Sequence, residues 1–293
     1  MTIDFKESNI DIENQQAKWI DIPSLNTDAE PLHFSAANGF PVLSYLEFFS
    51  LLSNNFNITT MDCRGVWGAT HPLDFTMHGF ADDLIYALEK KHKQPVIGVG
   101  HSLGGFVTLL AAIERPDLFS KIILIEPASL PNRWIDSIYP YIPNSILFNL
   151  FPFMKGSLLR QSQWQSKQNF YDRYRMHNTY NRFTETSFNN YMHAALIKKD
   201  NLFELQFSPN WEAHIFSIVE FIWKHLLKVT VPTVFIRAEH SNLYSQKQFT
   251  KHNKNLPNYI TPIEIDNTYH LLPLEAPKIT SKIITKLSTY NNI

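Results

Sequence analysis

The sequence predicts an α/β fold, in which a mostly parallel sheet is flanked by helices and interrupted by a helical insertion. Over the first 127 residues, short apolar runs alternate with helical patterns, as expected of strands joined by crossover helices. Between residues 128 and 228 aromatic side chains are frequent and no convincing strand is visible. Apolar runs return afterwards, so we predict a core formed by residues 1–127 and 229–293, with a helical cap at 128–228.

Six segments are predicted as buried strands, at 31–37, 57–62, 95–100, 121–126, 231–237 and 260–266. The helical patterns between the first four strands lie at 43–53, 78–91 and 103–116, and a closing helix is expected from Ala276 to Tyr290. In the second of these helices, Phe80, Leu84, Ile85 and Leu88 recur at a spacing that places them on one face.

The composition is that of a folded globular chain. Of its 293 residues, 44% are hydrophobic and 18% charged, which allows a large core. The net charge of −1 predicts no binding to nucleic acid, and no apolar run approaches the roughly 20 residues of a membrane span. The single cysteine, Cys63, cannot form an internal disulfide, and the N-terminus lacks a signal-peptide pattern. We expect a cytoplasmic protein with neither a metal nor a cofactor, and leave its oligomeric state open.

The turn between the strand at 95–100 and the helix at 103–116 carries the clearest chemical signal. Residues 100–104 read Gly-His-Ser-Leu-Gly, so two glycines leave space around Ser102. Such a turn forces the serine into a strained backbone conformation that exposes its hydroxyl. The helix that begins at Leu103 directs its first N–H groups toward the serine, where they can stabilise negative charge. We therefore predict that Ser102 is a nucleophile.

Two further loops are expected at the same edge of the sheet. The loop from Ala36 to Pro41 contains a tight turn whose Phe40 N–H, together with the Leu103 N–H, would form an oxyanion hole. A serine is a weak nucleophile without a base. We predict that His270 is this base, because it follows the last strand and directly precedes the closing helix.

In this order, these motifs resemble the α/β-hydrolase superfamily, and in particular its serine hydrolases with a helical cap. GHSLGG is similar to the family's nucleophile elbow, which implies that Ser102 is the nucleophile, and HLLPLEAP to its histidine segment, which implies that His270 is the base. ANGFP resembles the oxyanion loop, with Asn38 where histidine is common. MDCRGVWGAT, residues 61–70, resembles an Asp-x-Arg-Gly-x-Gly loop of the family.

The resemblance leaves the acid of the catalytic triad open. Similar sequences carry an aspartate in the loop after the strand at 231–237, where this chain has Asn242. An amide cannot stabilise the imidazolium that forms when the histidine accepts a proton. Some family members place the acid at the end of the preceding strand, which is Glu126 here. We favour Glu126, with Glu239 as a second candidate and the absence of any acid as a third possibility.

A serine nucleophile implies acyl transfer through a tetrahedral oxyanion and an acyl-enzyme. The aromatic insertion predicts an apolar pocket above Ser102, so the expected substrate is a carboxylic ester with an apolar acyl or alcohol part. The same residues would serve an acyltransferase or a carbon–carbon bond hydrolase. Asn242 also leaves open a ligand-binding protein with weakened catalysis.

Overall fold

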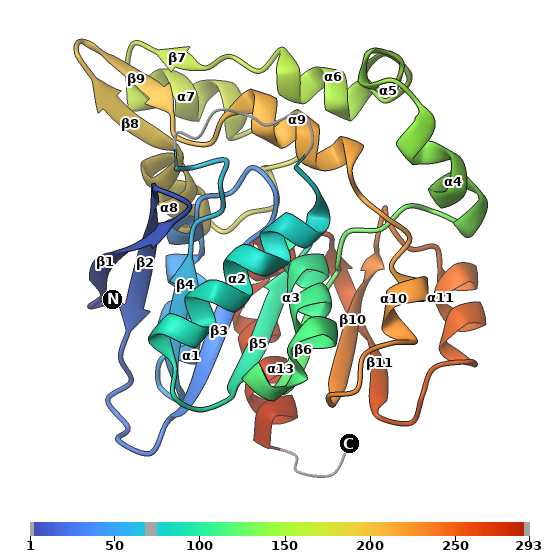
Figure 1. Cartoon of the computed structure of the whole chain (residues 1–293). Helices are drawn as coiled ribbons and strands as arrows, with labels where there is room; N and C mark the ends of the chain where they lie inside the picture. Colours follow the sequence, from blue (N-terminus) through green and yellow to red (C-terminus); the bar gives the residue numbers. More distant parts are fainter. Residues whose placement is uncertain (1–2, 68–74, 290–293) are drawn as a thin grey trace.

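An eight-stranded sheet forms the centre of the computed structural model, which describes residues 3–67 and 75–289 (Figure 1). The strand order is β1-β2-β4-β3-β5-β6-β10-β11. All six predicted strands are present, and each pairs in parallel with its neighbours among the six. They are β3 (Glu30–Ser35), β4 (Phe56–Met61), β5 (Val96–His101), β6 (Phe119–Ile125), β10 (Thr233–His240) and β11 (Ile260–Tyr269).

The strands β1 (Lys6–Ile12) and β2 (Gln15–Ile22) extend one edge of the sheet and were not predicted. They form an antiparallel hairpin, and β2 runs antiparallel to β4. Glu13 and Asn14 close the hairpin with φ angles of 50° and 63°, as in two-residue turns that match the twist of a hairpin. In an antiparallel strand at the edge of a sheet, only one face is buried. Apolar residues such as Ile10 and Ile12 therefore alternate with polar ones and form no continuous apolar run in the sequence.

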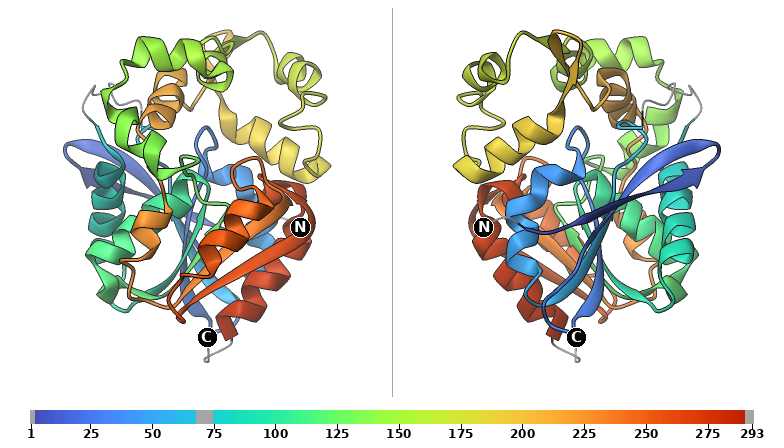
Figure 2. Two further views of the ribbon diagram at one scale, coloured as in Figure 1. Left: turned by 90° about the vertical axis from the view of Figure 1, so that its right-hand side faces the viewer. Right: turned by 90° about the vertical axis from the view of Figure 1, so that its left-hand side faces the viewer.

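Helices cover both faces of the sheet (Figure 2). One face carries α2 (Met77–Lys91), α3 (Leu103–Glu114) and α11 (Gln246–Asn253), whose buried side chains share one apolar cluster. The other face carries the 3-10 helix η1 (Val42–Tyr45) and the helices α1 (Leu46–Leu52), α12 (Leu272–Glu275) and α13 (Pro277–Thr289), which share a second cluster. A further 3-10 turn, η2 (Pro116–Leu118), leads from α3 into β6.

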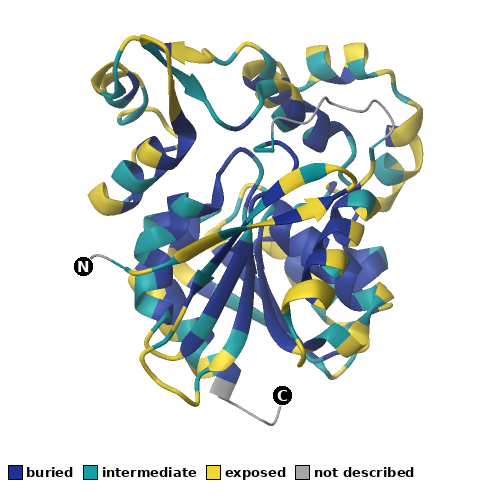
Figure 3. Cartoon of the chain, turned by 60° about the vertical axis from the view of Figure 1, so that its left-hand side comes forward, coloured by how far each residue is buried: buried dark blue, intermediate teal, exposed yellow. Residues whose placement is uncertain are grey.

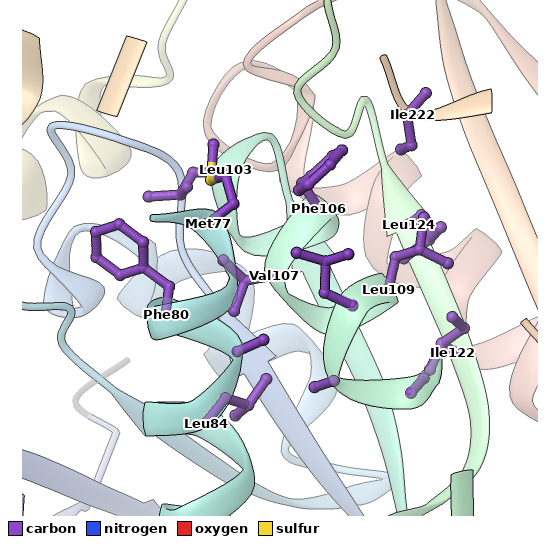
Figure 4. Close-up of a cluster of buried hydrophobic side chains, with 14 of the residues drawn as sticks. Met77, Phe80, Leu84, Leu103, Phe106, Val107, Leu109, Ile122, Leu124 and Ile222 are labelled. Atoms are coloured by element: carbon purple, nitrogen blue, oxygen red, sulfur yellow. The ribbon is translucent and has the colours of Figure 1, made fainter. Parts of the chain in front are cut away.

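The helix α3 is buried along almost its whole length because it lies between β6 and α2 (Figure 4). Leu103 and Val107 face Met77, Phe80 and Leu84 of α2, and the labelled side chains of β6 close the other side. Since α3 begins directly after Ser102, this packing fixes the position of the turn that carries the predicted nucleophile. Figure 3 shows that the central strands are buried as well.

The chain between β6 and β10 lies over one end of the sheet (Figure 1). The expectation that residues 128–228 contain no strand was wrong, because an antiparallel three-stranded sheet with the order β7-β9-β8 is present. Its strands are two to four residues long, which is too short to give a visible sequence pattern. They are β7 (Gln163–Trp164), β8 (Leu196–Lys199) and β9 (Leu202–Leu205).

The helices described between β6 and β10 are α4 (Arg133–Ile138), η3 (Tyr139–Tyr141), α5 (Asn144–Leu150), α6 (Pro152–Leu158), α7 (Lys167–Tyr174), α8 (Glu185–Ala195), α9 (Pro209–Ser217) and α10 (Trp223–Leu226). The last of them packs against α3, and Trp223 stacks on Phe235 of β10 with ring centroids 5.2 Å apart. Our division at 128–228 thus assigns to the cap a helix that packs on the core. Within residues 3–67 and 75–289, no helix has the length and apolar character needed to span a membrane.

Candidate active site

Ser102 occupies a strained turn between β5 and α3. Its φ of 53° and ψ of −113° lie outside the conformations that residues other than glycine normally adopt. Three backbone hydrogen bonds hold the turn: the Ser102 N–H donates to the Ile125 carbonyl at 3.0 Å, and the Ser102 carbonyl accepts from the N–H groups of Ala128 at 2.8 Å and Phe106 at 3.2 Å. Two of these bonds join Ser102 to residues at and directly after the end of β6, so this segment holds the serine backbone in place.

The two glycines of the motif are required because backbone segments meet there. A Cβ built on Gly100 would lie 2.3 Å from the Gly104 carbonyl oxygen, and one on Gly104 would lie 2.1 Å from the carbonyl oxygen of Ser35. The Gly104 N–H also donates to the Ala36 carbonyl at 3.0 Å. The first turn of α3 thus lies directly against the loop after β3, which was predicted to carry the second oxyanion donor.

The structure brings Ser102, His270 and Glu126 into one hydrogen-bonded chain. The Nε2 atom of His270 lies 3.1 Å from Ser102 Oγ, and its Nδ1 atom lies 3.2 Å from Glu126 Oε2. A carboxylate can only accept, so Nδ1 carries the ring proton and Nε2 is left to accept from the serine hydroxyl. This is the tautomer that a general base requires.

Glu126 is completely buried and is held by other groups besides the histidine. It follows β6 with a φ of 44°, its Oε1 atom accepts from the Ala238 N–H at 2.8 Å, and its Oε2 atom accepts from the Ser241 hydroxyl at 2.7 Å. These donors satisfy a buried carboxylate and fix its direction toward His270.

The two alternative acid positions lie elsewhere. Asn242 is exposed. Glu239 is exposed as well, and its Oε2 atom accepts from the Asn267 N–H at 2.7 Å. Of the three residues considered at the sequence level, the structure brings Glu126 to the histidine.

The two predicted oxyanion donors differ in their surroundings. The Leu103 N–H belongs to the first turn of α3, where N–H groups have no acceptor inside the helix. The Phe40 N–H donates to the Ala37 carbonyl at 3.2 Å, a bond that the sequence did not predict. Gly39 precedes it with a φ of 83°, which closes the tight turn.

His101 is a component of the site that the sequence reasoning missed, although it lies inside the recognised motif. Its Nε2 atom lies 2.9 Å from the His270 carbonyl, so Nε2–H donates, and its Nδ1 atom accepts from the Tyr45 hydroxyl at 2.9 Å. The Tyr45 oxygen in turn accepts from the Ala37 N–H at 3.2 Å. Burial, reinforced by nearby His270, lowers the pKa of His101 to about 3, so the ring is neutral and joins the oxyanion loop to the histidine loop.

The 61–70 loop supports the same edge, although residues 68–70 lie outside the described part of the chain. Asp62 accepts from the Val42 N–H at 2.7 Å, directly after the oxyanion loop. Burial raises the pKa of Asp62 to about 6, against the effect of this hydrogen bond. Arg64 donates two hydrogen bonds of 2.7 Å to the Asp83 carboxylate, which fixes the loop to α2.

A cavity of about 40 Å³ lies beside the oxyanion loop. Phe40, Leu103 and Val107 contribute to its lining, together with Phe80 and Leu84 of α2. The described lining residues lie between 33 and 107, so this is not the cap-lined pocket above Ser102 that the sequence led us to expect.

Comparison with known proteins places this geometry in context. The model of the alpha/beta hydrolase family matches residues 32–282. The uncharacterized hydrolase YugF of Bacillus subtilis is 23% identical over 252 residues, which cover 82% of this chain and 83% of that protein. The monoglyceride lipase of Rattus norvegicus is 23% identical over 216 residues, which cover 72% of this chain and 64% of the lipase. The crystal structure of E-2-(acetamidomethylene)succinate hydrolase superposes with a TM-score of 0.76 at 18% identity, covering 98% of this chain and 100% of that one.

The close approach at Gly104 generates a first prediction. Gly104→Ala should destabilise the protein by about 3 kcal/mol or prevent folding, because the new methyl group meets backbone atoms that cannot move independently. Gly156→Ala in α6 is the matched control. Nothing lies within 4 Å of a Cβ at that position, so the change should stabilise the helix by about 0.5–1 kcal/mol. Urea unfolding measures the stability of both variants relative to the wild type. Equal changes in the two variants would contradict the packing described for the turn.

The neutral state of His101 generates a second prediction. A histidine whose folded-state pKa is lowered contributes stability that is present above its ordinary pKa of about 6.5 and is lost as the pH falls from there toward 3. The free energy of unfolding of the wild type minus that of His101→Gln should therefore decrease by up to about 1.4 kcal/mol per pH unit below pH 6.5.

Urea unfolding between pH 7.5 and 4.5 tests this decrease. His193→Gln, which replaces an exposed histidine of α8, serves as the control for the loss of a surface histidine. A pH-independent difference for His101→Gln would mean that the ring can accept a proton without loss of stability.

Proposed function

The chain belongs to the alpha/beta hydrolase family and is an esterase-like hydrolase, and on that premise we propose that it cleaves carboxylic esters with apolar groups through a serine acyl-enzyme. The observation that carries the proposal is the chain of hydrogen bonds from Glu126 through His270 to the strained Ser102. It supplies a nucleophile, a base in the required tautomer and a buried negative charge behind that base.

The proposed reaction begins when Ser102 Oγ attacks the ester carbonyl carbon and its proton passes to His270 Nε2. The resulting imidazolium is stabilised by Glu126, and the carbonyl oxygen becomes an oxyanion facing the N–H groups of Leu103 and Phe40. The carbon–oxygen bond to the alcohol then breaks, and the alcohol leaves with the proton from Nε2. Water, deprotonated by the same nitrogen, attacks the acyl carbon. The bond from this carbon to Ser102 Oγ then breaks, Oγ takes the proton from Nε2, and the carboxylic acid is released.

The Phe40 N–H must serve two acceptors in this reaction. Its bond to Ala37 measures 3.2 Å, at the long end for N–H···O hydrogen bonds. We propose that an oxyanion shares or replaces this weak acceptor, because a charged oxygen binds an N–H group more strongly than a neutral carbonyl does.

The apolar substrate group is proposed from the aromatic side chains of the insertion. The cavity of about 40 Å³ beside Phe40 and Leu103 does not add to this argument, because Asp62 and Asp83 are among its described lining residues and Ser102 and His270 are not. The name of the monoglyceride lipase, a relative of 23% identity, points to an ester bond as well.

The alternatives differ in product or rate. An acyltransferase would pass the acyl group to an acceptor other than water, and a carbon–carbon bond hydrolase would release a carbon fragment in place of an alcohol. A binding protein with weakened catalysis was considered because of Asn242. The contact between Glu126 and His270 supports catalysis over this alternative, since a carboxylate at the end of β6 can take the place of the missing aspartate.

A third prediction tests the nucleophile. A fluorophosphonate probe should label the wild type and p-nitrophenyl esters should be hydrolysed, whereas Ser102→Ala should lose the label and about 10⁴-fold or more in kcat, because alanine has no hydroxyl to form the acyl-enzyme. Circular dichroism checks that the variant remains folded. Labelling of folded Ser102→Ala at the wild-type rate would exclude Ser102 as the nucleophile.

A fourth prediction tests the acid. Glu126→Gln should lower kcat by at least about 10²-fold, because the imidazolium loses its counter-charge. Asn242→Asp should change kcat little, since Asn242 is exposed and Glu126 already provides the charge. Glu239→Gln, which removes an exposed carboxylate near the end of β10, is the matched control. A thousandfold gain in Asn242→Asp with no loss in Glu126→Gln would place the acid in that loop instead.

A further inference from the structure

A largely buried ion pair lies in the insertion between β6 and β10. Nη1 of Arg160, which follows α6, lies 2.9 Å from Oε2 of Glu212 in α9, and the two side chains are 10% and 14% exposed. The guanidinium also donates to the hydroxyls of Tyr180 and Tyr191. The other Glu212 oxygen accepts from the Ser157 hydroxyl at 3.0 Å, so the carboxylate is held in one place.

The carboxylate of this pair lies against the oxyanion loop. A Cβ built on Gly39 would lie only 3.1 Å from Glu212 Cδ, and the Asn38 side-chain amide donates to the Glu212 backbone carbonyl at 2.9 Å. The Phe40 ring packs on Tyr191, with ring centroids 5.1 Å apart. A buried negative charge is therefore adjacent to the residue that precedes Phe40, whose N–H is the proposed oxyanion donor.

We propose that Arg160 is a positioning residue for the reaction: it cancels the charge of Glu212 beside the oxyanion loop, so that Glu212 can anchor the loop without repelling the oxyanion. This inference rests on the proposed function. An unpaired carboxylate close to a developing oxyanion would raise the barrier, because charges in a partly buried site are poorly screened. A neutral pair keeps the anchoring contacts and removes the repulsion.

Arg160 can maintain this neutralisation at any working pH. Burial opposes its charge, but Tyr180, Tyr191 and Glu212 outweigh burial and hold the pKa of the guanidinium well above its ordinary value. A pair with a purely structural role would depend only on contact between the two side chains. The charge-cancelling role additionally depends on which of the two charges is removed, and this difference can be measured.

The experiment compares two variants that break the same ion pair and leave opposite charges. In Arg160→Gln the carboxylate remains, so the rate of labelling by a fluorophosphonate and kcat for a p-nitrophenyl ester should fall about 10-fold, with KM little changed. In Glu212→Gln the guanidinium remains and attracts the oxyanion, so both rates should rise about two- to threefold. The variant Arg160→Gln/Glu212→Gln should return to within about threefold of the wild type.

Arg175→Gln and Glu185→Gln are the matched controls. This pair also lies in the insertion, with 3.2 Å between Nε and Oε2, but Glu185 is largely exposed and contacts Tyr171 and Asn189 rather than the oxyanion loop. Both control variants should keep the wild-type rates. Thermal unfolding of every variant separates loss of folded protein from loss of rate.

Opposite effects of the two changes support the proposal. A fall in labelling rate and kcat in both Arg160→Gln and Glu212→Gln, or an effect confined to KM, overturns it in favour of a purely structural pair. If Arg160→Gln does not fold, Glu212→Gln decides alone, because a rise supports charge cancellation and a fall contradicts it. A wild type that the probe does not label would overturn the proposed function, and this inference with it. A labelled wild type with unchanged rates in folded Arg160→Gln would overturn this inference alone.

Discussion

The strand-to-helix turn at Ser102 is the constraint on which the site depends. Its backbone conformation costs roughly 1–3 kcal/mol, and it persists because neighbouring elements leave no alternative. Gly104 lies against the loop after β3, the Ser102 N–H is bound to the end of β6, and the rest of α3 is packed between β6 and α2. The serine is therefore held by the fold, and its hydroxyl lies where the other loops converge.

The loops that carry the site residues meet because the strands before them are parallel. In a parallel sheet, the loops after the strands emerge at one edge, so residues 168 positions apart in the chain can meet, as Ser102 and His270 do. His101 connects two of these loops by hydrogen bonds. Its neutral ring joins Tyr45, which holds the oxyanion loop, to the carbonyl of His270. Protonation would place a second donor opposite Tyr45, so the same burial that keeps the ring neutral keeps the two loops connected.

The sequence predicted the parts of the molecule that have strong local patterns. Buried parallel strands are continuous apolar runs, and the Ser102 turn has a steric requirement that can be recognised from its glycines. The β1–β2 hairpin and the β7–β9–β8 sheet were missed because short, half-buried strands carry little signal. The roles of His101 and of the Arg160–Glu212 pair depend on contacts between distant segments. The hydrogen bond from the Phe40 N–H to the Ala37 carbonyl could not be predicted from any residue pattern either.

The acid illustrates why the choice between Glu126, Glu239 and Asn242 could not be made from spacing. All three lie near the ends of β6 and β10, which are neighbours in the sheet. Glu126 reaches His270 because it, too, has a positive φ, which turns its side chain toward the histidine as the chain leaves β6. The two strained turns support each other, since Ser102 and the segment Ile125–Ala128 exchange two backbone hydrogen bonds. Relaxing either turn would leave buried backbone groups without partners, which costs about 1–3 kcal/mol for each group. The proposed nucleophile and the proposed acid are thus positioned by one structural unit, and an acid placed after β10 would lack this connection to the serine.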